Sequence, residues 1–107
     1  MFVAIYQAYL KQGTEAEYQR LWQITAKYFI ERRGALGSCL HKGPGGLWVA
    51  YSRWPDKATR DASWPGENAP SDELPAEVRD AILGIKACLD TTRKIPDLEL
   101  EVVEDYL

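Results

Sequence analysis

The sequence predicts one α+β domain over residues 1–107, with the β-α-β-β-α-β order of a ferredoxin-like fold. Two observations support this prediction. Period-two alternation marks strands at 2–10, 37–42, 47–54 and 97–106. Apolar residues recur at helical spacing over 14–33 and 76–89. This order gives a four-stranded antiparallel sheet with helices on one face, and 107 residues suffice for one modest core.

The first strand carries apolar residues on both of its alternating sets. One set is Phe2, Ala4, Tyr6, Ala8 and Leu10, and the other contains Val3, Ile5 and Tyr9. A strand that is apolar on both sides is covered on both sides. We therefore expect it in the centre of the sheet, with helices on one face and a second copy of the chain on the other.

The segment from Thr14 to about Arg33 reads as the first long helix. Thr14 and Glu17 have the spacing of a capping box, and Gly34 is a plausible stop. The apolar face of this helix comprises Tyr18, Leu21, Trp22, Thr25, Tyr28 and Phe29. We expect this face to pack against the sheet.

Two strands, 37–42 and 47–54, flank the turn Gly43-Pro44-Gly45-Gly46. If all four of these residues form the turn, Lys42 pairs with Leu47. His41 then lies opposite Trp48 and shares its face. This register predicts that the histidine belongs to the same side of the sheet as Trp54.

The second half of the chain contains two further helices and the last strand. Pro55 ends the preceding strand and Asp56 can cap a short helix over 57–64. Residues 65–75 form either a lid, an interaction loop or a plain surface loop. A helix follows over 76–89, and the alternating strand over 97–106 is expected at a half-exposed edge.

Composition excludes several classes of function. The net charge is −3 and the thirteen Lys and Arg residues are dispersed, so we expect no nucleic-acid partner. No apolar run is long enough to span a membrane. The N-terminal residues lack the pattern of a signal peptide, which predicts a cytoplasmic protein. Cys39 and Cys88 make no metal or redox spacing, and buried reduced thiols are favoured over a disulfide.

The segment from Leu47 to Trp64, LWVAYSRWPDKATRDASW, resembles the antibiotic-biosynthesis-monooxygenase-like domains of the dimeric α+β-barrel superfamily. The resemblance extends over residues 2–64 and more loosely to the C-terminus. It implies a homodimer whose two sheets close into a shared barrel, and a pocket between sheet and helices in each subunit. Members of this group include cofactor-free monooxygenases that act on aromatic or quinol substrates.

Two functions are compatible with this resemblance. One is a cofactor-independent monooxygenase-like enzyme that acts on a small aromatic or quinone-like molecule. The other is a non-catalytic dimeric protein of the same fold that binds a small molecule or a partner. Whether the chain is an enzyme is left open by its residues.

Candidate site residues are mainly aromatic. His41 can act as a general base and Trp64 is the second catalytic candidate, while candidate substrate-binding residues are Trp22, Tyr51, Arg53 and Trp54. Each also has a structural interpretation: His41 as a hairpin residue, Arg53 as the partner of an acidic side chain, and the aromatic residues as core. Asn68 is expected to form a turn.

Departures from the family pattern narrow the chemistry. Haem-degrading relatives carry an Asn in the first strand and a later axial His, whereas this chain has Gln7 and no histidine after His41. Many relatives carry Glu two residues before the strand-ending Trp, where this chain has Ser52. We therefore expect no cofactor and no metal, and no obvious carboxylate base in that strand.

Overall fold

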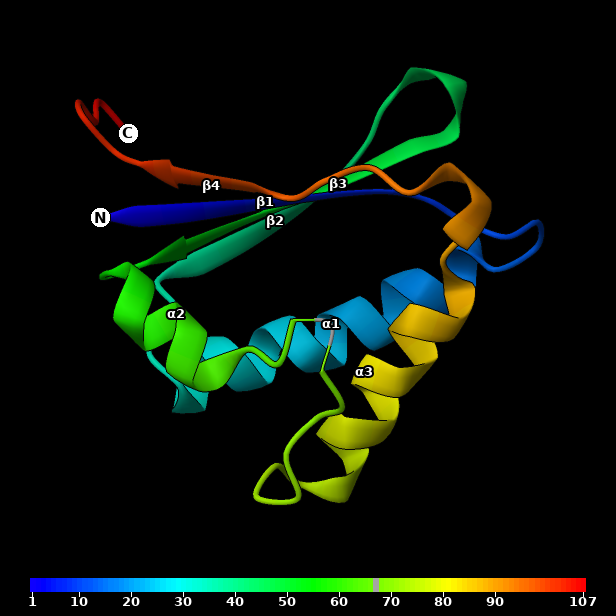
Figure 1. The fold of residues 1–107 in the computed structure, drawn as a ribbon, viewed down its shortest axis with the longest axis horizontal. Helices are drawn as coiled ribbons and strands as arrows, with labels where there is room; N and C mark the ends of the chain where they lie inside the picture. The colour runs from blue at the N-terminus through cyan, green and yellow to red at the C-terminus, as the bar shows by residue number, and fades with distance from the viewer. Residues whose placement is uncertain (67) are drawn as a thin grey trace.

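A computed structural model describes residues 1–66 and 68–107, and its elements follow the predicted β-α-β-β-α-β order (Figure 1). The strands are β1 (Phe2–Tyr9), β2 (Gly37–Lys42), β3 (Leu47–Trp54) and β4 (Leu98–Glu101). The α-helices are α1 (Glu15–Arg32), α2 (Lys57–Ser63) and α3 (Ala76–Cys88), and short 3-10 turns occur at Pro44–Gly46 and Thr91–Arg93. The ferredoxin-like fold class is thus confirmed.

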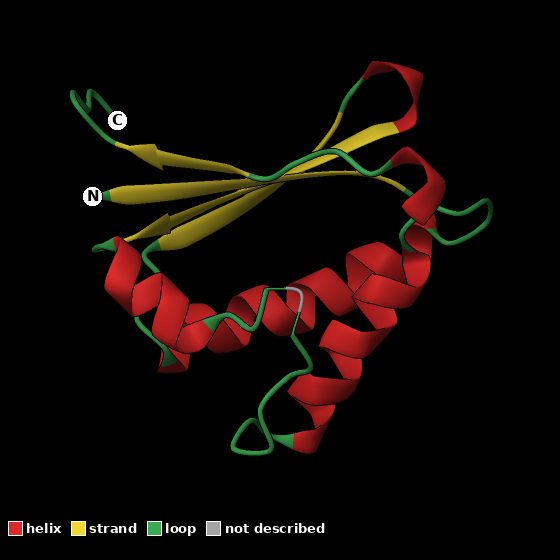
Figure 2. Ribbon diagram, viewed as in Figure 1, coloured by secondary structure: helices red, strands yellow, loops and turns green. Residues whose placement is uncertain are grey.

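The four strands form one antiparallel sheet in the order β2-β3-β1-β4. The central position predicted for the first strand is confirmed, since β1 pairs with both β3 and β4. All three helices lie on one side of the sheet (Figure 2). The opposite side, here called the outer face, is not covered by any helix among the described residues.

The predicted register of the β2–β3 hairpin is wrong by one residue. Lys42 pairs with Trp48 and His41 pairs with Val49. The cause is a shorter turn: Pro44–Gly46 forms a 3-10 turn in which Gly45 and Gly46 adopt positive φ, and the Gly43 amide donates to the Leu47 carbonyl. A shift of one residue exchanges the two faces of a strand, so His41 lies on the outer face.

The predicted capping box of α1 is also absent. The Thr14 hydroxyl donates to the Lys11 carbonyl at 2.7 Å and makes no capping bond to the helix. Thr14 has φ −104° and ψ 2°, outside the extended region from which a cap side chain normally accepts a helix amide. Glu17 instead accepts from Arg20 on the helix surface at 2.6 Å.

The short helix α2 begins as the sequence predicts. The Asp56 carboxylate accepts both the amide and the hydroxyl of Thr59 at 2.7 Å. The edge position of β4 is also confirmed, but this strand ends at Glu101, earlier than predicted. Its leucines, Leu98 and Leu100, pair with Ile5 and Val3 and therefore share the outer face.

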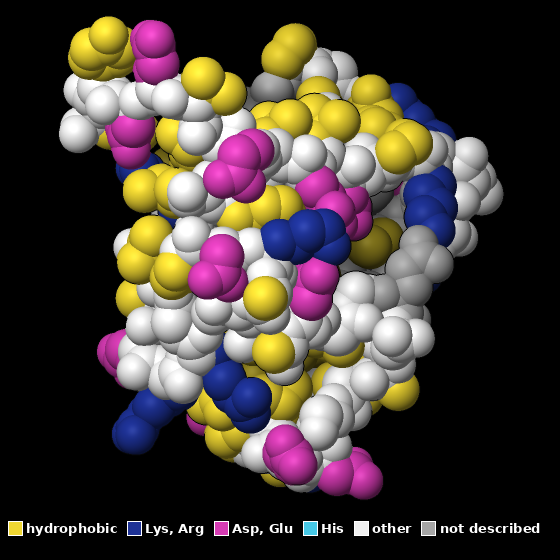
Figure 3. Space-filling model, turned by 60° about the vertical axis from the view of Figure 1, so that its left-hand side comes forward, with side chains coloured by type: hydrophobic (Ala, Val, Ile, Leu, Met, Phe, Trp, Pro, Cys, Tyr) yellow, Lys and Arg dark blue, Asp and Glu magenta, His cyan; other side chains and the backbone are white. Residues whose placement is uncertain are grey.

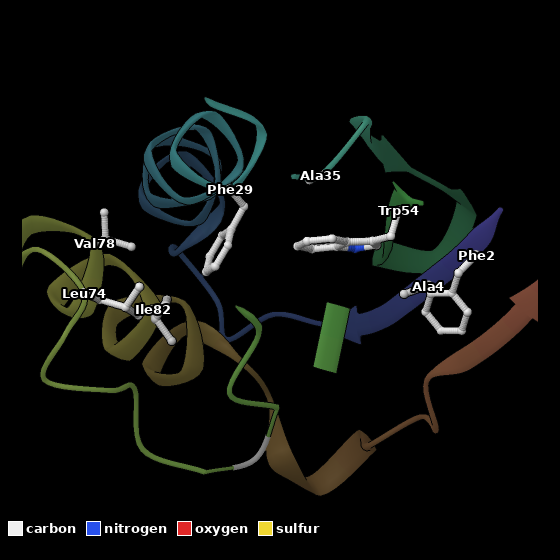
Figure 4. Close-up of a cluster of buried hydrophobic side chains, with 8 residues drawn as sticks. All are labelled: Phe2, Ala4, Phe29, Ala35, Trp54, Leu74, Val78 and Ile82. Carbon is white, nitrogen blue, oxygen red and sulfur yellow. The ribbon is translucent and has the colours of Figure 1, made fainter. Parts of the chain in front are cut away.

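Two hydrophobic clusters join the sheet to the helices. The larger cluster is drawn in Figure 4 and comprises Phe2, Ala4, Phe29, Ala35, Trp54, Leu74, Val78 and Ile82. The smaller cluster comprises Tyr18, Trp48 and Cys88. Of the two cysteines, Cys88 is buried as expected, whereas Cys39 is exposed, because the corrected register places it on the outer face. Neither forms a disulfide. No helix among the described residues has the length and hydropathy needed to cross a membrane.

Candidate functional site

A cavity of about 380 Å³ lies between the helix-facing side of the sheet and the helices. Residues from β1, β3, α1 and α3 line it, together with the segments that follow α2 and α3. Along the strands its lining includes the small residues Ala8, Ala50 and Ser52. Small side chains at these positions leave space that larger ones would fill.

Aromatic rings form much of the cavity wall. Trp22, Trp54 and Trp64 line it together with Tyr6 and Phe29. Phe29 packs edge-on against Trp54 and Trp64, with ring centroids 6.3 and 5.5 Å apart. Such a wall suits a flat aromatic ligand.

The cavity brings together three of the six predicted site residues, namely Trp22, Trp54 and Trp64. His41, Tyr51 and Arg53 do not line it. They lie on the outer face, where His41 pairs with Val49 and Tyr51 pairs with Ile5. Their position follows from the pleat, because Trp54 and its neighbour Arg53 must face opposite sides.

Two of these outer-face residues, His41 and Arg53, make polar contacts with other residues. His41 is exposed, and its Nδ1 lies 3.1 Å from the Val49 carbonyl oxygen. Arg53 contacts the Met1 sulfur and donates to Asp105. The structural interpretation of Arg53 as the partner of an acidic residue therefore matches its contacts.

The indole nitrogen of Trp54 is a buried donor without an acceptor among the described residues. Trp54 is only 3% exposed and projects from β3 toward Phe29 of α1 (Figure 4). An unpaired buried N–H costs about 1–3 kcal/mol. A ligand that placed an oxygen atom beside this nitrogen would recover that cost.

A polar group that contacts the cavity wall through Tyr6 was not predicted from the sequence. Arg60 of α2 is buried and donates to the Tyr6 hydroxyl at 3.2 Å. It also donates to Asp61 and to Glu99 of β4. Tyr6 belongs to the helix-facing set of β1, and this position could have identified it as a site residue from the sequence. The sequence gives no indication that Arg60 is buried, because arginine in a short polar segment usually faces solvent.

The electrostatics of this group follow from burial and hydrogen bonding. Burial lowers the pKa of Arg60, but its bonds to Asp61, Glu99 and Tyr6 outweigh burial and raise it overall. Burial raises the pKa of Tyr6, and the Arg60 contact opposes that rise. The pKa values of Asp61 and Glu99 are lowered, chiefly by hydrogen bonds from Lys57 and Arg60 respectively. The cluster is therefore an ionised guanidinium beside a neutral phenol.

Other polar groups lie along the same wall. Asp97 is its carboxylate among the described residues, and Lys86 and Lys94 are its amines. The Lys86 amine donates to the Asn68 carbonyl at 2.7 Å, which ties α3 to the segment after α2. Ser38 and Ser52 share a hydrogen bond of 3.0 Å across the hairpin. Within residues 1–66 and 68–107 no cluster of His, Cys, Asp or Glu could hold a metal ion.

Comparison with known proteins identifies the class of fold. No protein-family profile matches the chain, and no curated protein matches it. Solved structures do match over nearly the whole length. The fold is that of the antibiotic biosynthesis monooxygenase-like proteins, as the resemblance implied.

Three of these structures illustrate the match. Rv0793 from Mycobacterium tuberculosis is 12% identical, with 99% of this chain and 98% of that chain covered and a TM-score of 0.70. A structure described as an antibiotic biosynthesis monooxygenase is 16% identical, with 97% and 100% covered and a TM-score of 0.70. SnoaB from Streptomyces nogalater, a cofactor-independent oxygenase solved as a mutant, is 16% identical, with 98% and 96% covered and a TM-score of 0.66. At these identities the likeness extends to the fold alone.

Proposed function

We propose that the chain is a cofactor-independent monooxygenase-like enzyme that acts on a small aromatic or quinone-like molecule. The observation that carries this proposal is the cavity of about 380 Å³, whose wall includes three tryptophans, one of which has a buried indole nitrogen without an acceptor among the described residues. The fold shared with SnoaB is compatible with it. The cavity lies within the usual size range of small-molecule sites.

The proposed reaction needs no electron source besides the substrate. A ring CH2 next to a carbonyl, or a phenolic hydroxyl of a hydroquinone, loses a proton, and the resulting enolate or phenolate transfers electrons from its ring carbon to oxygen. For a CH2 group one oxygen atom becomes a carbonyl on that carbon, and the second leaves as water together with the two hydrogens. The protein binds the ring, orients it and excludes bulk water.

Four side chains have roles in this scheme. Trp54 donates its indole N–H to the substrate oxygen on which negative charge develops, a use of a preorganised donor in a dry site. Asp97 is the carboxylate among the described residues of the wall and receives the substrate proton. Trp22 and Trp64 pack against the substrate ring from the cavity wall.

Oxygen consumption tests the proposal. We would supply dihydroxyanthracenes, anthrone and small quinols to the purified protein and follow dissolved oxygen and product absorbance. Trp54→Phe keeps an aromatic ring but removes the N–H, and should lower kcat by about tenfold or more. Asp97→Asn should lower kcat by more than Trp54→Phe does, because it removes the proposed base. Failure of every compound to be consumed would refute the enzymatic function.

A second function is favoured by one observation. The described wall contains a single carboxylate and no histidine, which is a sparse set for acid–base chemistry. A non-catalytic protein would bind the same aromatic compounds in the cavity without consuming oxygen. Binding measured by tryptophan fluorescence quenching, combined with oxygen uptake, distinguishes the two functions.

We also propose that two copies of the chain associate through the outer face. This face carries Ile5, Val49, Tyr51, Leu98 and Leu100, and both leucines are 44% exposed. In Figure 3, hydrophobic side chains gather along the top of the molecule, the side of the sheet turned away from the helices. Because no helix among the described residues covers this surface, a second sheet is the occupant that fits it.

A further inference from the structure

The guanidinium of Arg60 is held from several directions at once. Its Nε donates to Asp61 at 2.8 Å, one terminal nitrogen donates to Tyr6, and the other donates to Glu99. The central carbon of the group lies over the Phe2 ring, 5.0 Å from the ring centroid. A guanidinium held in this way has little freedom, so the Tyr6 oxygen that it contacts is also fixed in position.

The direction of the Arg60–Tyr6 bond determines what the phenol can do. Arginine has donors and no acceptor, so the Tyr6 oxygen accepts in this bond. The phenol hydrogen is therefore left for an acceptor other than Arg60. The positive charge beside the oxygen also makes the phenol a stronger donor.

The position of Tyr6 relates this donor to the cavity. Tyr6 lines the wall, and its ring packs against Trp64 with centroids 5.9 Å apart. Tyr6 pairs in register with Ala50 of β3, and both residues border the cavity. A ligand stacked beside Trp64 would thus have the phenol at its edge.

We propose that Tyr6 donates a hydrogen bond to an oxygen atom of the bound ligand, and that Arg60 is the positioning residue that fixes the phenol for this contact. The inference rests on the proposed function and narrows its ligand class. The cavity takes planar aromatic compounds that carry a carbonyl, phenol or enolate oxygen, and discriminates against the corresponding hydrocarbons. Glu99 and Asp61 contribute by holding Arg60.

Equilibrium binding of 9-fluorenone and fluorene tests this inference. The two probes have nearly the same flat shape, and only fluorenone has a carbonyl acceptor. Wild-type protein should bind fluorenone about tenfold more tightly, and Tyr6→Phe should reduce this preference by about three- to tenfold. The infrared carbonyl stretch of bound fluorenone should rise in Tyr6→Phe, since a hydrogen bond is lost. Fluorene affinity should not change, because that probe accepts no hydrogen bond.

Matched variants separate this role from a structural one. Tyr9→Phe removes a phenol from the same strand outside the cavity and should retain the full preference. Arg60→Met should weaken the preference and shift the carbonyl stretch, and Arg60→Lys should restore both in part. If Arg60→Met does not fold, Tyr6→Phe decides alone, because it leaves Arg60 with both of its carboxylates.

The outcomes distinguish this inference from the proposed function. An unchanged preference and carbonyl stretch in Tyr6→Phe would overturn the role of Tyr6, even if the enzyme consumes oxygen. Failure of wild-type protein to bind either probe would overturn it as well. A Tyr6-dependent preference without any oxygen consumption would support the inference and refute the enzymatic function alone.

Discussion

Gly84 of α3 faces Leu21 of α1 so closely that a Cβ atom at position 84 would lie 2.5 Å from a Leu21 methyl carbon. Leu21 is buried, and the two helices pack against each other along this contact. Both helices line the cavity, through residues such as Trp22 and Ile82. The absence of a side chain at Gly84 therefore sets how closely the two helices that border the site approach each other.

The first prediction concerns this contact. Gly84→Leu should lower the free energy of unfolding by about 2 kcal/mol, because the added side chain overpacks the helix interface by more than the gain in helix propensity. Chemical denaturation measures the change. Ala87→Leu, at an exposed position of the same helix, is the matched control and should change stability little. Equal stability of the two variants would contradict the prediction.

Filling the cavity should weaken ligand binding. Ala26 of α1 lines the cavity, and Ala26→Phe places a ring in the space that we assign to the ligand. We expect the affinity for 9-fluorenone to fall by about tenfold or more, measured by fluorescence quenching. Ala16→Phe adds the same ring at an exposed position of α1 outside this cavity, and should leave the affinity intact. Retained binding in Ala26→Phe would place the ligand elsewhere.

The placement of His41 outside the cavity leads to the third prediction. His41→Ala should leave the rate of oxygen consumption within about twofold of wild type, since the ring lies on the opposite face of the sheet. Trp64→Phe, within the cavity, should raise KM because it reduces the stacking surface. A large loss of kcat in His41→Ala would instead support the role of general base that the sequence suggested for this residue.

The association of two copies can be tested on the outer face. Leu100→Arg places a charge among the exposed apolar residues of this face and should convert a dimer to a monomer in light scattering at micromolar concentration. Leu83→Arg is the control, because Leu83 is exposed on α3, on the helix side of the sheet. Wild-type protein that is monomeric and fully folded at these concentrations would refute the association.

The cap of α2 predicts a pH dependence of stability. Hydrogen bonds from the Thr59 amide, and next from its hydroxyl, lower the pKa of Asp56 below 3.8. A carboxyl with a lowered folded pKa stabilises the fold above its unfolded pKa, and this contribution is lost as the pH falls through the folded value. Asp56→Ala should therefore lower the melting temperature at pH 7, and the difference from wild type should shrink as the pH falls below about 3.8 toward the lowered folded pKa. A difference that is the same at pH 7 and pH 3 would contradict this account.

Much of the fold could be predicted because the relevant signals are local. The helical periodicity of Tyr18, Leu21 and Phe29 identified the buried face of α1, and all three residues are buried. The two apolar sets of β1 indicated its central position, which the sheet confirms. Trp54 and Trp64 were predicted as site residues from their aromatic character, and both lie on the cavity wall.

Other features depend on contacts between distant parts of the chain. Buried Arg60 is paired with Tyr6, 54 residues earlier, and with Glu99, 39 residues later. No local sequence pattern predicts partners at such separations. The leucines and glutamates of β4 alternate as the sequence predicts, but the partner of Glu99 was not predicted: its side chain lies on the helix-facing side and accepts from Arg60. With Glu99 bound to Arg60 on the helix-facing side, Leu98 and Leu100 lie on the outer face.

The sequence by itself determined the order of the elements, the helix faces and the central strand, because each arises from the periodicity of neighbouring residues. The tertiary structure alone decided the hairpin register, and with it the side of the sheet on which His41 and Cys39 lie. The physical reason is that a strand alternates with a period of two, so one residue more or less in the turn exchanges its faces. The number of residues in the turn is set by turn geometry and by long-range strand pairing. Local periodicity is the same for both registers, so it cannot distinguish them.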